Sequence, residues 1–200
     1  RLYPKKLGVD MLSISSHKIH GPKGVGAVWI NKNLRIKPIL FGGGQESLIR
    51  SGTENVSGIA GFGMAAEITF RDMESNLEKV TRLRDLFIER LETEIKDFHI
   101  NSPEDASPYI LNVSFPDLRA EVLLHHLEES NIYVSTGSAC SSRKNIHSHV
   151  LEAIRLDKCY ISGAIRFSFS AFNTEQDVLD TIAALKMIIP KIRIQKNKRR

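Results

Sequence analysis

Lys18 lies in a stretch whose residue types suit covalent chemistry with an aldehyde. Ser15 and His17 stand just before it, and a turn rich in glycine and proline follows over residues 21–26. An amine of this kind can condense with an aldehyde while neighbouring hydroxyl and imidazole groups hold a phosphate. The pattern therefore favours a pyridoxal phosphate site. The alternative is a solvated loop lysine beside a turn that the glycines only punctuate.

Cys140 is a second candidate for chemistry, because it lies in a long polar loop. Arg143, Lys144 and His147 are close to it in sequence, and their positive charge would favour the thiolate form. Cys140 is therefore a credible nucleophile. Two alternatives remain open, an unreactive surface thiol and a metal site shared with His147 and His149, although that spacing matches no common zinc pattern.

Arg166 is a lone arginine in an otherwise apolar stretch, residues 163–170. A guanidinium in such a strand needs an anionic partner, either a structural carboxylate or the α-carboxylate of an amino acid substrate. Upstream, residues 42–55 form a glycine-rich segment with Arg50 and several hydroxyls. Such a loop can reach an anion, although by itself it is a weak phosphate signal.

Strands and helices alternate around these candidates. Periodicity predicts strands over residues 9–14, 25–30, 36–41, 109–115, 132–134 and 164–169. The strand over 25–30 is apolar enough to be buried on both faces. A long helix is expected to face the core with Met73, Leu77, Val80, Leu83, Phe87, Leu91 and Ile95. Further helices are expected over residues 118–127, 148–154 and 174–190.

The glycines of residues 58–63 resemble a dinucleotide motif only superficially, because the spacing is wrong and no strand precedes them. Close helix packing explains these small residues better. In the second half, helices that alternate with strands predict a small α/β domain.

Composition indicates a globular chain with a sizeable core, since 42% of its 200 residues are hydrophobic. Cys140 and Cys159 are too few for a disulfide framework, so free thiols in a cytoplasmic setting are expected. No apolar run is long enough for a membrane span. The net charge of +5 comes largely from the tail 191–200, which we interpret as a solvated terminus rather than a nucleic-acid site. The chain begins with Arg1 and almost directly enters a strand, so we expect it to be part of a longer protein.

Six motifs, in this order, resemble the cysteine desulfurases of the NifS/IscS class. These belong to the class V aminotransferase family and to the fold-type I (aspartate aminotransferase-like) pyridoxal phosphate enzymes. The resemblance runs from about Val9 to Asp177. Its motifs occupy residues 15–24, 42–46, 50–56, 138–140, 148–151 and 164–168.

The resemblance implies roles for particular residues. Lys18 is similar to the lysine that binds the cofactor covalently and moves the α-proton of the substrate, and Ser15 and His17 are similar to phosphate ligands. Thr53 is similar to a phosphate contact that this family supplies from the partner subunit, which implies a homodimer.

On the same basis, Cys140 is similar to the residue that takes sulfur as a persulfide, and Arg166 to the clamp on the substrate carboxylate. The implied reaction converts L-cysteine to L-alanine for iron–sulfur cluster assembly or tRNA thiolation, with a sulfur-acceptor or scaffold protein as partner. No resident metal is expected, although Cys140 could transiently ligate an iron–sulfur cluster.

The expected fold is therefore the C-terminal part of a fold-type I enzyme. Residues 1–67 would be the remainder of the cofactor-binding large domain, and residues 68–200 the long linking helix and small α/β domain. Alternatives are an inactive fragment, a piece that only docks a sulfur acceptor, or a related lyase that acts on selenocysteine.

Overall fold

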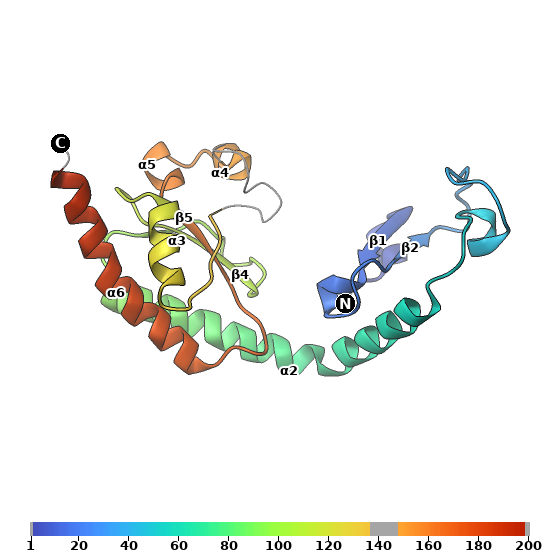
Figure 1. Cartoon of the computed structure of the whole chain (residues 1–200), viewed down its shortest axis with the longest axis horizontal. Coiled ribbons are helices and arrows are strands. Elements are labelled where there is room, and N and C mark those ends of the chain that lie inside the picture. Colours follow the sequence, from blue (N-terminus) through green and yellow to red (C-terminus); the bar gives the residue numbers. More distant parts are fainter. Residues whose placement is uncertain (1, 137–147, 199–200) are drawn as a thin grey trace. The chain divides into compact units, whose positions relative to one another are not determined.

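The computed structural model describes residues 2–136 and 148–198, and the chain divides into two compact units (Figure 1). We call Arg1–Met73 the N-terminal unit and Glu74–Arg200 the C-terminal unit. The longest helix, α2 (Val56–Glu94), contributes to both. The domain boundary expected after residue 67 is not tested by this division and stays a prediction.

The N-terminal unit is built around a two-stranded antiparallel sheet. Strand β1 pairs with β2 so that Ser15 faces Gly26 and Met11 faces Ile30. A 3₁₀ turn, η1, begins directly after β1 and contains Lys18. The elements of this unit that precede α2 are α1 (Pro4–Leu7), β1 (Met11–Ser15), η1 (Ser16–Ile19), β2 (Gly26–Ile30) and η2 (Gln45–Leu48).

Two sequence predictions for this unit are wrong. Residues 36–41 form no strand, and only an isolated bridge joins Leu40 to Arg50. Strand β2 is largely exposed rather than buried on both faces. Apolar composition alone predicted these features, and burial requires other polypeptide to cover the strand.

The C-terminal unit contains a three-stranded antiparallel sheet in the order β3-β4-β5. Helices α2, α3 and α6 cover one face of this sheet. Its elements after α2 are β3 (His99–Ile100), β4 (Ile110–Ser114), α3 (Ala120–Glu128), α4 (His149–Ala153), α5 (Lys158–Ile161), β5 (Ala164–Ser168) and α6 (Glu175–Lys198).

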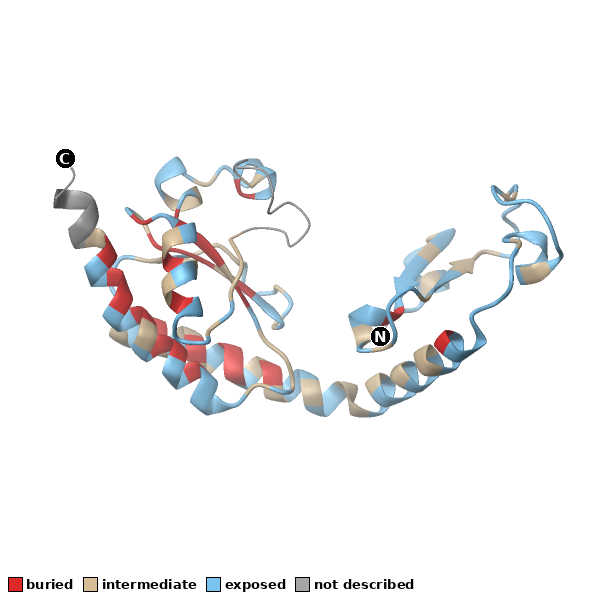
Figure 2. Ribbon diagram, in the orientation of Figure 1, coloured by how far each residue is buried: buried red, intermediate tan, exposed pale blue. Residues whose placement is uncertain are grey.

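One hydrophobic core joins these layers, and Figure 2 shows the buried residues of α2, α3, α6 and the sheet together. The sheet contributes alternate residues, which is the pattern of a strand with one buried face. As predicted, α2 buries Val80, Leu83, Phe87 and Leu91, although Leu77 is 44% exposed. The core members from the sheet are Leu111, Val113, Ile165 and Phe167.

Helix α6 begins with a capping box. The Asp177 backbone N–H donates to Thr174 Oγ1 at 3.2 Å, and the Thr174 N–H donates to Asp177 Oδ2 at 3.0 Å. The predicted end at Pro190 is wrong, because the helix continues to Lys198. Ile189 and Ile192 are both buried, and their burial offsets the hydrogen bond that proline cannot make.

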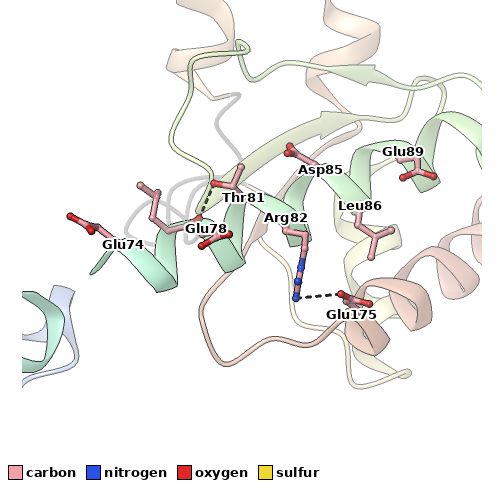
Figure 3. Close-up of a pocket in the computed structure, with 9 residues that line it drawn as sticks. Glu74, Glu78, Thr81, Arg82, Asp85, Leu86, Glu89 and Glu175 are labelled. Carbon is pink, nitrogen blue, oxygen red and sulfur yellow. Dashed lines mark hydrogen bonds and ion pairs between the residues drawn. The ribbon is translucent and has the colours of Figure 1, made fainter. Parts of the chain in front are cut away.

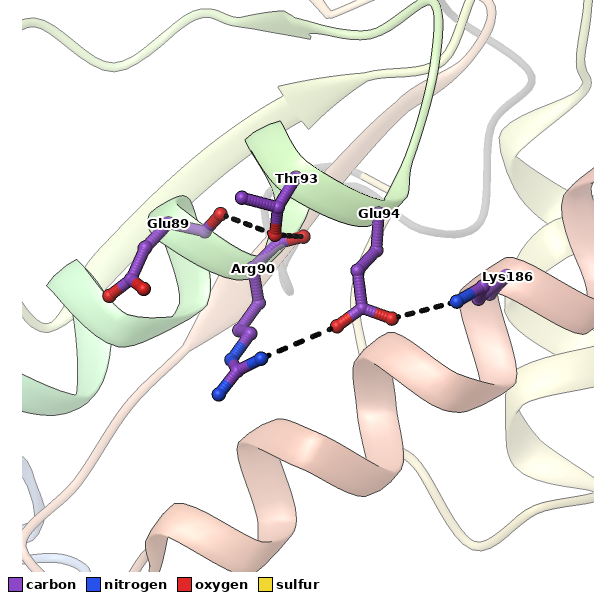
Figure 4. A network of polar contacts seen from close by, with 5 residues as sticks. All are labelled: Glu89, Arg90, Thr93, Glu94 and Lys186. Carbon is purple, nitrogen blue, oxygen red and sulfur yellow. Dashed lines mark hydrogen bonds and ion pairs between the residues drawn. The ribbon is translucent and has the colours of Figure 1, made fainter.

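Charged side chains tie α2 to α6 along their exposed sides (Figure 4). Glu94 accepts from Lys186 Nζ at 3.0 Å and lies 3.8 Å from Arg90 Nη1. These exposed pairs contribute little individually, so burial in the core is what holds the two helices together.

One further strand predicted for this unit is absent. Residues 132–134 form no strand, and the chain instead meets β5 through an isolated bridge from Ser135 to Arg166.

No helix within the described ranges is long and apolar enough to cross a membrane.

Candidate active site

The Lys18 turn presents three functional side chains on one short, exposed segment. Ser15 ends β1, and His17 and Lys18 lie within η1; all three are exposed. Between them, Ser16 is fully buried. The turn therefore anchors itself through Ser16 and leaves a hydroxyl, an imidazole and an amine outside.

Small residues of α2 hold this turn in place. A Cβ atom on Gly21 would overlap Ser16 Oγ and lie 3.1 Å from Ala65, and a Cβ on Gly61 would lie 2.7 Å from Pro22 Cγ. Gly58 in the same way meets Val25 too closely for any larger side chain. The close packing expected from residues 58–63 is confirmed at Gly58 and Gly61 but not at Gly63, and it fixes the backbone that follows Lys18.

Thr53 lies in a loop that hydrogen bonds close upon itself. Ser51 Oγ donates to the Gly43 carbonyl at 2.7 Å, and the Gly52 N–H donates to Gln45 Oε1 at 3.1 Å. Thr53 itself is exposed. Within the described ranges, the structure gives no hydrogen bond between Thr53 and the Lys18 turn.

Arg166 lies in the middle of β5 on the face of the sheet opposite the core. It is directly opposite Asn112 of β4, and on its other side its backbone exchanges two hydrogen bonds with Ser135, at 2.7 and 3.2 Å. Its Nε atom is buried and has no hydrogen-bond partner among the described residues. The structural carboxylate that the sequence left open is therefore not found in that part of the chain.

Cys140 lies outside the described residues, as do Arg143, Lys144 and His147. Its predicted role is therefore not tested by the structure, and neither is the alternative metal site. Cys159, interpreted from the sequence as structural, is an exposed free thiol of α5.

Sequence reasoning missed the polar neighbours of Arg166. Asn112 and Ser114 alternate with the buried apolar residues Leu111 and Val113 of β4, and this alternation was a signal that a second, polar face existed. Which strand would lie beside β4 was not visible from local sequence.

An open groove runs along α2 in the C-terminal unit (Figure 3). Its lining is mainly acidic, and Arg82 pairs with Glu175 across it at 3.4 Å. None of the described site candidates, Ser15, His17, Lys18, Thr53 and Arg166, lines this groove. We therefore assign this groove no part in the predicted chemistry.

Residues 1–180 match the family described as aminotransferase class-V, and the chain belongs to this family. It is 45% identical over 189 residues to a protein named cysteine desulfurase IscS from Dictyoglomus turgidum, covering 94% of this chain and 48% of that protein. It is 41% identical to cysteine desulfurase IscS 1 of Archaeoglobus fulgidus, covering 94% of this chain and 50% of that protein. The chain thus spans about half the length of these curated relatives.

Solved structures agree with this family assignment. A NifS-like protein from Rickettsia africae superposes with a TM-score of 0.83 at 33% identity, over 94% of this chain and 50% of that one. A structure titled SspA in complex with cysteine gives a TM-score of 0.66 at 31% identity, over 86% of this chain and 47% of that one. The predicted fold class, part of a fold-type I enzyme, is confirmed.

Proposed function

We propose that the protein carrying this chain is a pyridoxal phosphate-dependent cysteine desulfurase. The observation that carries the proposal is the turn that exposes Ser15, His17 and Lys18 while burying Ser16. Similarity to proteins named cysteine desulfurase supports the choice of reaction. The reaction would convert L-cysteine and the Cys140 thiol into L-alanine and a Cys140 persulfide.

The donor set of the turn fits pyridoxal phosphate. The Lys18 amine would bind the aldehyde, and the Ser15 hydroxyl and the His17 imidazole would bind the phosphate. When bound, this cofactor supplies an electron-accepting ring that weakens the bonds at the substrate's Cα. Lys18, once released from the aldehyde, would move the proton at Cα.

We assign Thr53 as a ligand of the cofactor phosphate that is bound at the Lys18 turn of a second copy of the protein. Its loop is closed by its own hydrogen bonds and none of them reaches the Lys18 turn in the described part of the chain. A partner subunit would then complete each site. The functional unit in this proposal is a homodimer.

Arg166 would bind the substrate carboxylate. Its guanidinium makes no ion pair within residues 2–136 and 148–198, and its buried Nε lacks a partner there. A buried donor without an acceptor costs free energy. A substrate carboxylate would therefore be stabilised both by the charge of the guanidinium and by a hydrogen bond from Nε. The planar fork of arginine suits that group.

Cys140 would take the sulfur. Its thiolate attacks the substrate sulfur, a new S–S bond forms, the bond from sulfur to Cβ breaks, and Cβ gains a proton to give alanine. Ser135 is hydrogen-bonded to the backbone of Arg166. Cys140 follows Ser135 by five residues, and five residues of chain span at most about 18 Å. The persulfide would pass to a sulfur-acceptor or iron–sulfur scaffold protein.

A second candidate is that the chain by itself is inactive and only docks such an acceptor. The chain spans about half of its relatives, and apolar side chains of its N-terminal unit are widely exposed. We therefore expect turnover only from the protein in which those surfaces are covered.

The test is sulfur transfer in the protein that carries this chain, purified with its cofactor. With L-cysteine, mass spectrometry should find one added sulfur on the Cys140 peptide and an equal amount of alanine in solution. Cys140→Ala should abolish sulfur transfer, whereas Cys159→Ala should leave it unchanged. Persistence of transfer at the parent rate in Cys140→Ala would contradict the proposal.

A further inference from the structure

A row of four polar residues crosses the sheet, and Arg166 is the charged member of this row. Asn101 follows β3, and its backbone N–H donates to the Asn112 carbonyl at 2.8 Å. Asn112 is the β4 partner of Arg166, and Arg166 is bridged to Ser135. Directly opposite residues share a face, so the four residues form one row on the face away from the core.

The Asn112 side chain is fixed within this row. Its Oδ1 accepts from Asn101 Nδ2, which also donates to Ser114 Oγ at 2.8 Å. Its backbone N–H donates to Ser102 Oγ at 2.9 Å. Each of these hydrogen-bond partners is an amide or a hydroxyl, so none of them brings a carboxylate to Asn112.

Several other arginines of the chain lie beside carboxylates. Arg71 contacts Asp72 at 2.7 Å, Arg82 contacts Glu175 at 3.4 Å, and Arg193 contacts Asp97 at 3.4 Å. At Arg166, by contrast, the row offers only neutral groups in the described part of the chain. A cross-strand neighbour with a carboxylate would attract the guanidinium strongly, since the site is partly shielded from water.

We propose that Asn112 is a positioning and specificity residue that keeps the charge of Arg166 available for the ligand's carboxylate. The inference rests on the proposed function, because it takes Arg166 as the carboxylate clamp. Asn112 lies directly opposite Arg166 in the neighbouring strand, and a neutral amide there leaves the guanidinium charge uncompensated. An aspartate at the same position would supply an internal carboxylate that competes with the ligand.

The test compares Asn112→Asp with Asn112→Ser in the holoenzyme. We expect Asn112→Asp to raise the KM for L-cysteine at least about tenfold with kcat changed less than about threefold, as loss of ground-state binding does. Asn112→Ser, which stays neutral, should change KM by less than about threefold. Equal effects of both variants would overturn the proposal, because they would show a purely structural role.

A second readout separates charge from folding. Cysteamine lacks the carboxylate of L-cysteine, so the ratio of the two binding constants, read from cofactor absorbance, isolates the Arg166 interaction. Asn112→Asp should lower this preference for L-cysteine at least about tenfold, about 1.4 kcal/mol, and an unchanged preference would contradict the inference. If that variant does not fold, Asn101→Asp should lower the preference about threefold, because its carboxylate is one strand further away, and no change would again contradict it.

Arg166→Gln distinguishes failure of this inference from failure of the proposed function. If Arg166→Gln abolishes the preference for L-cysteine and Asn112→Asp does not alter it, only the role of Asn112 is wrong. If Arg166→Gln itself leaves the preference unchanged, Arg166 is not the clamp and both statements fail.

Discussion

In the C-terminal unit, apolar side chains from three helices and two strands share one core, whereas in the N-terminal unit most of them are exposed. Of residues 2–73, only Ser16 and Gly58 are buried, and Ile39 and Phe41 are 90% and 83% exposed. A two-stranded sheet is marginally stable alone, and wide apolar exposure marks surfaces that other polypeptide covers. The contrast teaches that the Lys18 turn belongs to an incomplete unit, while Arg166 belongs to one that holds its own core.

The largest expected effect is a difference in amide hydrogen exchange between the two units. Amides of β4 and β5 should exchange at least about a thousandfold more slowly than those of β1 and β2, because global unfolding of a cored unit costs several kcal/mol. Mass spectrometry of peptic peptides would measure this. Equal protection of the amides of both sheets from exchange would contradict the difference in stability between the two units.

Gly163→Ala should destabilise the C-terminal unit by about 3 kcal/mol. A Cβ on Gly163 would overlap the Phe115 carbonyl oxygen and lie 3.3 Å from that of Leu118, and backbone atoms cannot yield cheaply. The control is Gly63→Ala, where a Cβ would meet nothing within 4 Å. Urea unfolding followed by circular dichroism should show a lower midpoint for Gly163→Ala only, and a parent-like midpoint would contradict the packing described.

Gly61→Ala should act on the N-terminal unit instead, with a local cost of about 1 to 3 kcal/mol. The new Cβ would press on Pro22, a rigid ring, and displace the segment after Lys18 from α2. Fluorescence of Trp29, the single tryptophan of the chain, should shift while the urea midpoint of the C-terminal unit stays unchanged. An unaltered emission spectrum, with Gly63→Ala as reference, would count against this packing.

The smallest effect concerns the capping box of α6. The hydrogen bond from the Thr174 backbone N–H, aided by the Asn173 side chain, lowers the pKa of Asp177. Its carboxylate thus adds stability above the ordinary aspartate value of about 3.9, and that stability is lost as pH falls through the lower folded pKa.

Asp177→Ala should therefore cost about 0.5 to 1 kcal/mol at pH 7 and progressively less toward pH 3. Asp180→Ala, which loses only a surface contact from Gln176, should cost less than about 0.5 kcal/mol. Thermal unfolding over this pH range would measure both. A cost for Asp177→Ala that is independent of pH would contradict the assigned linkage.

Much of the C-terminal unit was predictable because its signals are local. The three- and four-residue spacing of Val80, Leu83, Phe87 and Leu91 gave their common buried face, and the capping residues of α6 gave its start. Leu77 shares the spacing but is exposed, because periodicity defines a face and not how far along a helix the core extends.

The sequence pointed to candidate reactive residues, whose roles stay predictions, but not to their surroundings. Lys18 and Arg166 stood out by residue type, but the Asn112 neighbour of Arg166 depends on pairing between β4 and β5, which are distant in sequence. The prediction of a strand over residues 36–41 was wrong because it used only local apolar composition. Those residues have no partner strand in the described part of the chain.

The most direct test of the account is where the cofactor attaches. The protein that carries this chain would be loaded with pyridoxal phosphate, reduced with borohydride and digested, and mass spectrometry would locate the pyridoxyl group. We predict that it lies on Lys18 and that Lys18→Arg removes it, whereas Lys23→Arg does not. A pyridoxyl group on another lysine, or undiminished labelling in Lys18→Arg, would contradict the account.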